Sequence, residues 1–297
     1  MHKPVLLHES IEALDLGPAK VFLDGTLGGG GHTREVLRRF PGVRIIALDQ
    51  DPEASGLKEE GLKVERRTEN FGNLDKVLEE LGAKYVNAIL FDLGLSSDQL
   101  ESSGRGFSFQ NKEPLDMRMS GSGLTAALIL NSWDEHAIEL ILRGFGEEKY
   151  SRKIARVIAE RREQKPFETT RELVEAVLTA KPRTWRDKIP AGSRPYGRAG
   201  RHPATKTFQA LRIAVNEELT NLEKGLEKGF EALGPKGRLA VISFHSLEDR
   251  IVKNFFRTRV AEKAARQITK KPITAGEAER EANPRSRSAK LRVIEKI

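Results

Sequence analysis

The chain has 297 residues, no cysteine and a formal net charge of +8 at pH 7. Its length allows one large domain or two modest ones, and the lack of cysteine excludes disulfides and thiolate metal sites. No apolar run approaches the roughly 20 residues of a membrane-spanning helix, and the first residues lack the apolar core and cleavage site of a secretory signal. We expect a soluble protein of the cytoplasm.

Charge is distributed unevenly along the chain. Residues 1–142 contain 15 Lys and Arg against 23 Asp and Glu, whereas residues 143–212 contain 18 against 8. Residues 259–297 are also basic, with 11 against 5. This segregation indicates that the middle and the C-terminal part contact a polyanion, although solvated helix faces would give the same counts.

The first hundred residues alternate between short apolar runs and helical patterns. Strands are predicted at 21–24, 44–48, 62–66 and 86–91, and helices at 33–39 and 74–81. Near-continuous apolar strands that alternate with helices predict a parallel sheet covered on both faces.

This alternation stops near Gly104, and helical periodicity follows a Gly- and Ser-rich loop at 104–122. Apolar residues share one helical face in three segments: Ile138, Ile141 and Leu142; Ile154, Val157 and Ile158; Leu173, Val174 and Val177. Residues 181–203 combine prolines and glycines with many arginines and predict an exposed loop.

One long helix is predicted from about 204 to 233, with an apolar stripe that runs from Phe208 to Phe230. Strand character returns at 238–244, a helix follows from Leu247, and a last strand covers 290–297. The strand at 238–244 needs the sheet of the first four, because alone it could not bury both faces. The predicted fold is therefore α/β, with a Rossmann-like, doubly wound, mostly parallel sheet in residues 1–105 and 208–297 and an all-helical insertion in residues 106–207.

A glycine loop, residues 24–33 (DGTLGGGGHT), lies between the first strand and the first helix, where an open α/β sheet binds its ligand. A P-loop would have Lys-Ser/Thr in place of Gly31-His32, and a dinucleotide site would have glycine in place of Thr33. Asp24, directly before the loop, is also poorly placed beside a pyrophosphate. The loop therefore favours a cofactor without phosphates and with positive charge, and S-adenosylmethionine meets both conditions.

Three acids end three of the predicted strands: Asp24, Asp49 and Asp92. Because these strand ends meet at one sheet edge, the acids would form a negative cleft, in which Asp49 can accept the hydroxyls of a ribose. Alternatively, each acid caps the helix that follows it. Phe71 could stack on an adenine or belong to the core, and His32 could bind a carboxylate or cap its helix. No group of His, Asp and Glu has metal-binding spacing, so we expect no catalytic metal.

Seven segments occur in the order DGTLGGGGH, ALDQDP, DLGLSSDQL, RGFSF, PLDMRM, HPATKTFQALRIAVNEEL and SFHSLEDRIVK. With them the chain resembles the bacterial 16S ribosomal RNA cytosine-N4 methyltransferases of the MraW type. The resemblance extends from VLLHE near the start to NPRSRSAKLR near the end, and it implies a class I methyltransferase fold with a helical insertion.

The resemblance also implies a set of cofactor contacts and a substrate. The contacts fall on Gly30, Gly31, His32, Asp49, Phe71, Asp92 and Gln99, of which only Gln99 has no support from the residue pattern. The implied reaction transfers a methyl group from S-adenosylmethionine to the exocyclic N4 of a cytidine in the decoding region of small-subunit RNA. DNA amino-methyltransferases, which the family is said to resemble, carry Asp/Asn/Ser-Pro-Pro-aromatic after the fourth strand, where this chain has residues 92–95 (DLGL).

Asp92 is the predicted catalytic residue. The cytosine amine is a weak nucleophile, so the enzyme must hold it in line with the methyl group and accept its hydrogens. We hypothesise that Asp92 and the hydroxyl of Ser96 or Ser97 surround the amine.

The strongest RNA-binding candidate is the loop that combines basic residues with two aromatic ones, which can neutralise phosphates and stack unpaired bases. Its predicted contacts are Arg183, Trp185, Arg194, Tyr196, Arg198, Arg201 and Lys206. Alternatively, the loop is solvated and Trp185 packs in the core of the insertion. A second, weaker candidate is the tail with Arg285, Arg287, Lys290 and Arg292.

Two other classes of function remain open. The chain could methylate DNA or protein with the same cofactor, or it could be a non-catalytic RNA-binding or ribosome-assembly protein. Cofactor binding separates the last possibility from the others, because a binding-only protein would show no affinity for S-adenosylmethionine.

Overall fold

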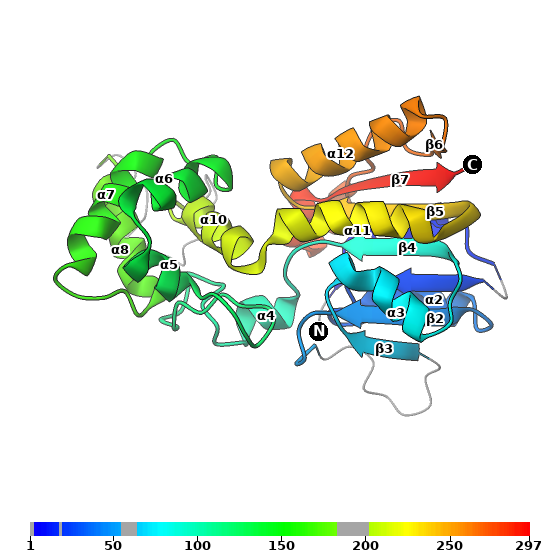
Figure 1. The fold of residues 1–297 in the computed structure, drawn as a ribbon, viewed down its shortest axis with the longest axis horizontal. Coiled ribbons are helices and arrows are strands. Elements are labelled where there is room, and N and C mark those ends of the chain that lie inside the picture. Colours follow the sequence, from blue (N-terminus) through cyan, green and yellow to red (C-terminus); the bar gives the residue numbers. More distant parts are fainter. Residues whose placement is uncertain (1–2, 18–19, 55–63, 183–201) are drawn as a thin grey trace. The chain divides into compact units, whose positions relative to one another are not determined.

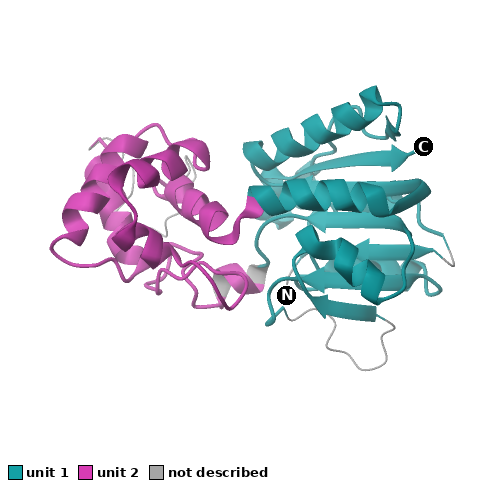
Figure 2. Ribbon diagram, in the orientation of Figure 1, with its two compact units in different colours: residues 1–96, 219–297 teal, residues 97–218 magenta. Residues whose placement is uncertain are grey.

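The computed structural model describes residues 3–17, 20–54, 64–182 and 202–297, in two compact units. Unit 1 comprises residues 1–96 and 219–297, and unit 2 comprises residues 97–218 (Figure 2). Unit 2 is larger at both ends than the predicted insertion, 106–207. The Arg105 carbonyl accepts the Met117 N–H, and residues 208–216 belong to a helix that packs within unit 2, so both flanks join the helical unit.

Unit 1 contains a seven-stranded sheet with the order β3-β2-β1-β4-β5-β7-β6. The strands are β1 (Val21–Asp24), β2 (Arg44–Asp49), β3 (Val64–Thr68), β4 (Val86–Asp92), β5 (Leu233–Ser243), β6 (Ala265–Gln267) and β7 (Lys290–Lys296). The first five strands pair in parallel, while β7 is antiparallel to both of its neighbours, β5 and β6 (Figure 1). The predicted α/β fold with a mostly parallel sheet is confirmed.

Helices cover both faces of this sheet, as doubly wound topology requires. One face packs against α3 (Leu74–Glu80), α11 (Glu218–Ala232) and α12 (Ser246–Ala261), and the other against α1 (Leu7–Ala13) and α2 (Gly31–Arg39). Alternate residues of β4 point to opposite faces of the sheet. Ile89 and Phe91 pack in the core beneath α3, α11 and α12, and Ala88 and Leu90 pack in the core beneath α1 and α2. Burial on both sides explains why the strands read as continuous apolar runs.

Several short elements are absent from the sequence-based prediction. They are α1, β6, α13 (Glu277–Ala282) and the 3-10 helices η1 (Phe71–Asn73) and η2 (Pro284–Ser288). The fifth strand also begins earlier than predicted, at Leu233, so Gly234 and Pro235 lie within a strand. The strand begins at Leu233 because this residue pairs with Val86 of β4, and the local residue pattern does not indicate that pairing.

Unit 2 is built from helices in its described part. They are α4 (Ser97–Glu101), α5 (Ala126–Ser132), α6 (Glu135–Gly144), α7 (Ser151–Arg162), α8 (Thr170–Ala180) and α10 (Thr205–Asn216). Residues from each of the three predicted apolar faces, such as Ile138, Ile154 and Leu173, are fully buried. No described helix of the chain has the length and apolar character needed to span a membrane.

The single long helix predicted for 204–233 is wrong at its centre. Glu217 adopts a left-handed conformation (φ 48°) between α10 and α11, and its N–H donates to the Ile213 carbonyl. The Asn216 side chain accepts the Met119 N–H and donates to the Met117 carbonyl. These contacts with a segment almost a hundred residues earlier stabilise the break, and the apolar stripe is divided between the two units.

Candidate functional site

Asp24, the last residue of β1, organises the glycine loop. It is almost fully buried; one carboxylate oxygen accepts the Thr26 N–H at 3.1 Å and the other accepts the Thr33 hydroxyl at 2.6 Å. Burial raises the pKa of Asp24 to about 6, against the opposing effect of these hydrogen bonds. Because both oxygens hold the loop and the first turn of α2 and the side chain is buried, we expect the Asp24 charge to act on a ligand through space.

Asp49, the last residue of β2, holds the same loop from the neighbouring strand. Its Oδ2 accepts the Gly28 N–H at 2.7 Å and its Oδ1 accepts the Asp51 N–H at 2.9 Å. Burial raises the pKa of Asp49, and these two bonds partly oppose that effect. Each carboxylate oxygen has a second lone pair, so both can still accept hydroxyl hydrogens from a sugar.

Asp92 ends β4 and carries a buried oxygen without a donor. Its backbone N–H donates to the Thr26 hydroxyl oxygen at 2.6 Å, and its Oδ1 accepts no hydrogen bond from the described residues. Burial raises the pKa of Asp92 well above its usual range; the charges of Asp24 and Glu248 add to this rise, and Arg285 opposes it. A buried carboxylate oxygen without a hydrogen bond lowers the stability of the folded protein. Such an atom is expected where a bound ligand supplies the missing donor.

His32 connects this acid to the start of the chain. Its ring is buried, with Nε2 3.1 Å from the Val5 carbonyl and Nδ1 3.6 Å from Asp92 Oδ2. Donation from Nε2 to the carbonyl leaves Nδ1 as the ring nitrogen that faces Asp92. The N-cap of α2 is Gly30 and no side chain caps this helix, so His32 does not have the capping role that the sequence left open. Its contact with a carboxylate of a ligand stays a prediction.

The glycines that follow β1 allow a tight turn into α2. Gly28 (φ 48°) and Gly30 (φ 72°) lie in the left-handed region, and Gly30 is the N-cap of α2. A Cβ on Gly31 would lie 2.8 Å from the Pro4 side chain, and one on Gly28 would lie 3.6 Å from Ser96 Cβ. Ser96 therefore lies beside the loop, and its contact with the substrate amine stays a prediction.

We expect Gly25→Ala to lower the free energy of unfolding by about 1–3 kcal/mol, the usual cost of overpacking. An added Cβ would lie 2.5 Å from two ring carbons of Phe91, which is fully buried and cannot move without shifting the core. Urea unfolding measures the change. Gly121→Ala is the control, because its Cβ would meet no atom within 4 Å. Equal unfolding midpoints for the two variants would contradict the packing argument.

Phe71 packs in the core layer at the end of β3. Its ring centroid lies 4.7 Å from that of Phe91, and a Cβ on Gly225 would lie 2.4 Å from its ring. The side chain remains partly exposed. The core interpretation that the sequence left open therefore accounts for most of its contacts, and stacking on an adenine stays a prediction.

Not every predicted residue can be compared with this group. Gln99 lies on α4 in unit 2, where its carbonyl accepts the Ser103 hydroxyl, and the side chain of Ser97 lies outside the described atoms. The predicted RNA contacts Arg183, Trp185, Arg194, Tyr196, Arg198 and Arg201 also lie outside the described residues. Lys206 is described, and its Nζ donates to the Glu147 carbonyl at 2.7 Å.

The basic tail is largely structural. Lys290 and Arg292 both pair with Asp249, at 2.9 and 2.7 Å, and Arg292 is buried. These two residues fasten β7 to the start of α12, so their weak candidacy as RNA contacts is not supported by their surroundings. Arg287 is exposed, while Arg285 acts electrostatically on Asp92.

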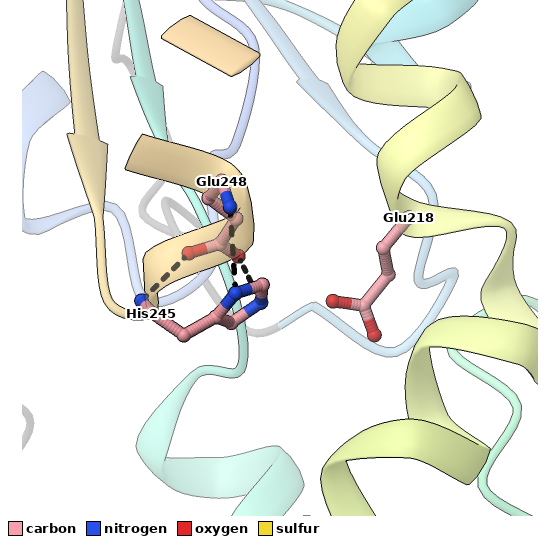
Figure 3. A group of neighbouring side chains, drawn as sticks. All are labelled: Glu218, His245 and Glu248. Carbon is pink, nitrogen blue, oxygen red and sulfur yellow. Dashed lines mark hydrogen bonds and ion pairs between the residues drawn. The ribbon is translucent and has the colours of Figure 1, made fainter. Parts of the chain in front are cut away.

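His245 and Glu248 form a part of the site that the sequence prediction missed. They belong to SFHSLEDR, which follows β5, and they form the capping box of α12 (Figure 3). Glu248 is buried and its Oε2 accepts the backbone N–H groups of Phe244 and His245. Glu218, also drawn there, belongs to unit 2 and pairs with Arg212 at 2.7 Å. The available signal was His245-x-x-Glu248 after an apolar strand, a variant of the Ser/Thr-x-x-Glu capping box.

The ends of β1, β2, β4 and β5 thus bring together acids at the carboxyl edge of the sheet. Asp24 and Glu248 both raise the pKa of Asp92, which shows that their charges act on one small region. Such a region repels a phosphate and attracts a cation, and the unsatisfied Asp92 oxygen offers the cation or an N–H group an acceptor. The residues present therefore fit a cofactor that has a positive centre and no phosphate.

Comparisons with known proteins agree with this geometry. The model of the MraW methylase family matches residues 1–297. A protein of Heliobacterium mobile named "Ribosomal RNA small subunit methyltransferase H" is 47% identical over 321 residues, which cover 100% of this chain and 99% of the relative. This chain is also similar to two proteins of the same name. The one from Deinococcus radiodurans is 47% identical, over 99% of this chain and 89% of the relative, and the one from Synechococcus elongatus is 46% identical, over 100% and 95%. From its full-length match, the chain belongs to the MraW methylase family.

Proposed function

We propose that this protein transfers a methyl group from S-adenosylmethionine to the exocyclic N4 of a cytidine in the RNA of the small ribosomal subunit. Its relatives carry the name of small-subunit ribosomal RNA methyltransferases. The observation that carries the chemical part is the buried, unsatisfied Oδ1 of Asp92 at the end of β4, beside the glycine loop. Cytoplasmic ribosomal subunits would supply the substrate.

The cofactor is proposed to lie along the glycine loop. Gly30, Gly31 and His32 would contact its amino-acid part, Asp49 its ribose hydroxyls and Phe71 its adenine. Asp92 and Gln99 complete the proposed set. The bound cofactor supplies an electrophilic methyl group on a sulfonium, and the acids of the strand ends stabilise that charge.

Asp92 is proposed to orient the cytosine amine. Its carboxylate accepts an N–H hydrogen bond, which turns the nitrogen lone pair towards the methyl group and supports the nitrogen as it becomes tetrahedral. After attack the nitrogen is cationic and acidic, so Asp92 or water takes its proton without difficulty. The Ser96 hydroxyl, beside Gly28, is proposed as the second partner of the amine. Orientation of this kind can contribute on the order of 7–11 kcal/mol in the best cases.

One experiment tests the proposed function directly. Isolated small ribosomal subunits that lack this modification are incubated with the protein and isotope-labelled S-adenosylmethionine, and the labelled nucleotide is mapped by mass spectrometry. The expected product is a single N4-methylated cytidine. Labelled protein or DNA, or RNA labelled at a carbon atom, would show that the proposal is wrong.

Cofactor binding near pH 6 should release protons. The pKa of Asp24 is about 6, and a nearby sulfonium favours its ionised form, so binding lowers this pKa. Isothermal titration at pH 6 in buffers of different ionisation enthalpy measures the release. S-adenosylhomocysteine, which lacks the sulfonium charge, is the control and should release fewer protons. Equal release by both ligands would show that the acids do not sense the sulfonium.

The same shift gives the pH dependence of stability a definite sign. Because the folded-state pKa of Asp24 lies above the unfolded value of 3.8, its contribution to stability is present below pH 4 and is lost as the pH rises through about 6. A bound cation offsets that loss, so stabilisation by the cofactor should increase over the same pH range.

A further inference from the structure

Four basic side chains gather on one face of α7 in unit 2. Lys149, just before the helix, and Arg152, Lys153 and Arg156 on it are all exposed. The spacing i, i+3, i+4 and i+7 places them together, opposite the buried face formed by Ser151, Ile154, Ala155 and Ile158. We call these four residues the α7 basic face.

Ion pairing within the protein does not account for this face. Arg156 approaches Glu160 at 3.3 Å, in a pair whose two side chains are about 70% exposed (71% and 68%). Lys149, Arg152 and Lys153 form no ion pair with any of the residues that the structure describes. Three cations therefore project into solvent side by side, which raises the free energy of the unbound protein.

Their position along the helix is also unfavourable. Arg152 and Lys153 lie in the first turn of α7, which contains no acid, although the helix dipole favours acids at this end and bases at the other. Helix stability would thus prefer the opposite charge at these positions. Local stability does not explain the α7 basic face, whereas binding of an anionic partner does.

The turn before α7 also contacts Lys181, the residue that follows α8. Lys181 donates to Glu148 Oε2 at 2.7 Å and to the Pro203 carbonyl at 2.6 Å. Lys181 and Pro203 are therefore in contact with each other, and Lys181 pairs with the residue directly before Lys149. Lys206 is fixed to the Glu147 carbonyl in the same turn.

We propose that the α7 basic face binds the phosphate backbone of the RNA substrate, an inference that rests on the proposed function. A row of cations suits a polyanion with repeated phosphates. Stable attachment to an anionic membrane needs an apolar contribution in addition to the cations, and the described residues of α7 present no exposed large apolar side chain. The α7 basic face therefore contributes affinity and register, while chemistry occurs at the sheet edge.

The test reverses two of the charges in the full-length protein. Arg152→Glu with Lys153→Glu should weaken binding of a single-stranded RNA oligonucleotide on the order of ten-fold. The slope of log K against log salt should fall by about 0.7 for each phosphate that the variant no longer neutralises. The melting temperature should stay unchanged or rise, because acids suit this end of the helix. Affinity for S-adenosylmethionine should not change.

Two control variants separate this role from general charge and from folding. Lys84→Glu with Lys271→Glu makes the same change in net charge at exposed positions of unit 1 and should keep RNA affinity close to wild type. Arg152→Lys with Lys153→Arg keeps the charges and should restore binding.

Three results would overturn the inference. In the first, the double reversal binds RNA as tightly as the Lys84→Glu, Lys271→Glu variant does. In the second, the double reversal loses binding to phosphatidylglycerol vesicles but keeps its binding to RNA. The third is a wild-type protein that binds no RNA, which would overturn the proposed function as well. The first result, obtained with a wild-type protein that methylates subunits, would overturn this inference alone.

Discussion

Replacing Asp92 by Asn should lower kcat for methyl transfer by about 10²–10³-fold, the usual cost of removing one preorganised group from a transition state. Asn keeps the size of the side chain and the backbone hydrogen bond to Thr26, but it removes the negative charge that the pyramidal, cationic nitrogen needs. Folding should not suffer. The neutral amide removes a buried charge that Asp24 and Glu248 disfavour, so thermal stability should be equal or higher.

The division between kcat and KM identifies what Asp92 does. Single-turnover methylation of small subunits measures the chemical step, and calorimetry measures cofactor affinity. Asp75→Asn is the matched control, because Asp75 is half exposed, pairs with Lys228 on the surface and should not affect turnover. If Asp92→Asn keeps the wild-type kcat and only raises the KM for the cofactor, Asp92 contacts the cofactor alone, and the proposed contact with the amine is wrong.

Removing one partner of the Glu148–Lys181 pair should destabilise the protein by about 3–5 kcal/mol. The two side chains are 3% and 5% exposed and lie 2.7 Å apart, so loss of one partner leaves a buried charge without compensation. Lys181→Met also removes the hydrogen bond to the Pro203 carbonyl. Chemical denaturation should show this loss in the transition of unit 2.

The double variant provides the stronger test of this pair. Glu148→Met with Lys181→Met removes both buried charges, and replacement of such pairs by apolar residues is often neutral or stabilising. Its stability should therefore exceed that of Lys181→Met alone, and a double-mutant cycle gives the coupling. Additive losses in the double variant would mean that the ion pair is not what holds these residues together.

The parallel part of the fold is predictable from the sequence because its strands are buried on both faces. β1, β2 and β4 differ from their predicted ranges by at most one residue, since each is a continuous apolar run that ends in an acid. The break at Glu217 has no such signal. Residues on both sides favour helix and continue one apolar stripe, and only contacts of Asn216 with the distant Met117–Met119 segment interrupt it.

The site follows the same rule. Asp24, Asp49 and Asp92 could be grouped in advance, because the ends of neighbouring parallel strands meet at one edge. Glu248 was missed because it does not end a strand: it lies in the first turn of α12 and approaches Asp92 through the pairing of β4 with β5. For Phe71 the sequence left both a core role and a ligand contact open; its ring packs against Phe91 in the core, and stacking on an adenine stays a prediction.

The place of β7 limits how far this protein can be shortened. β7 lies between β5 and β6, so it is an interior strand although it is formed by residues 290–296. A premature stop codon before Lys290 would leave β5 as an open edge from Arg238 to Ser243, where its backbone would be free to pair with another chain. Such a product would self-associate into insoluble material rather than survive as a smaller, weakly active enzyme.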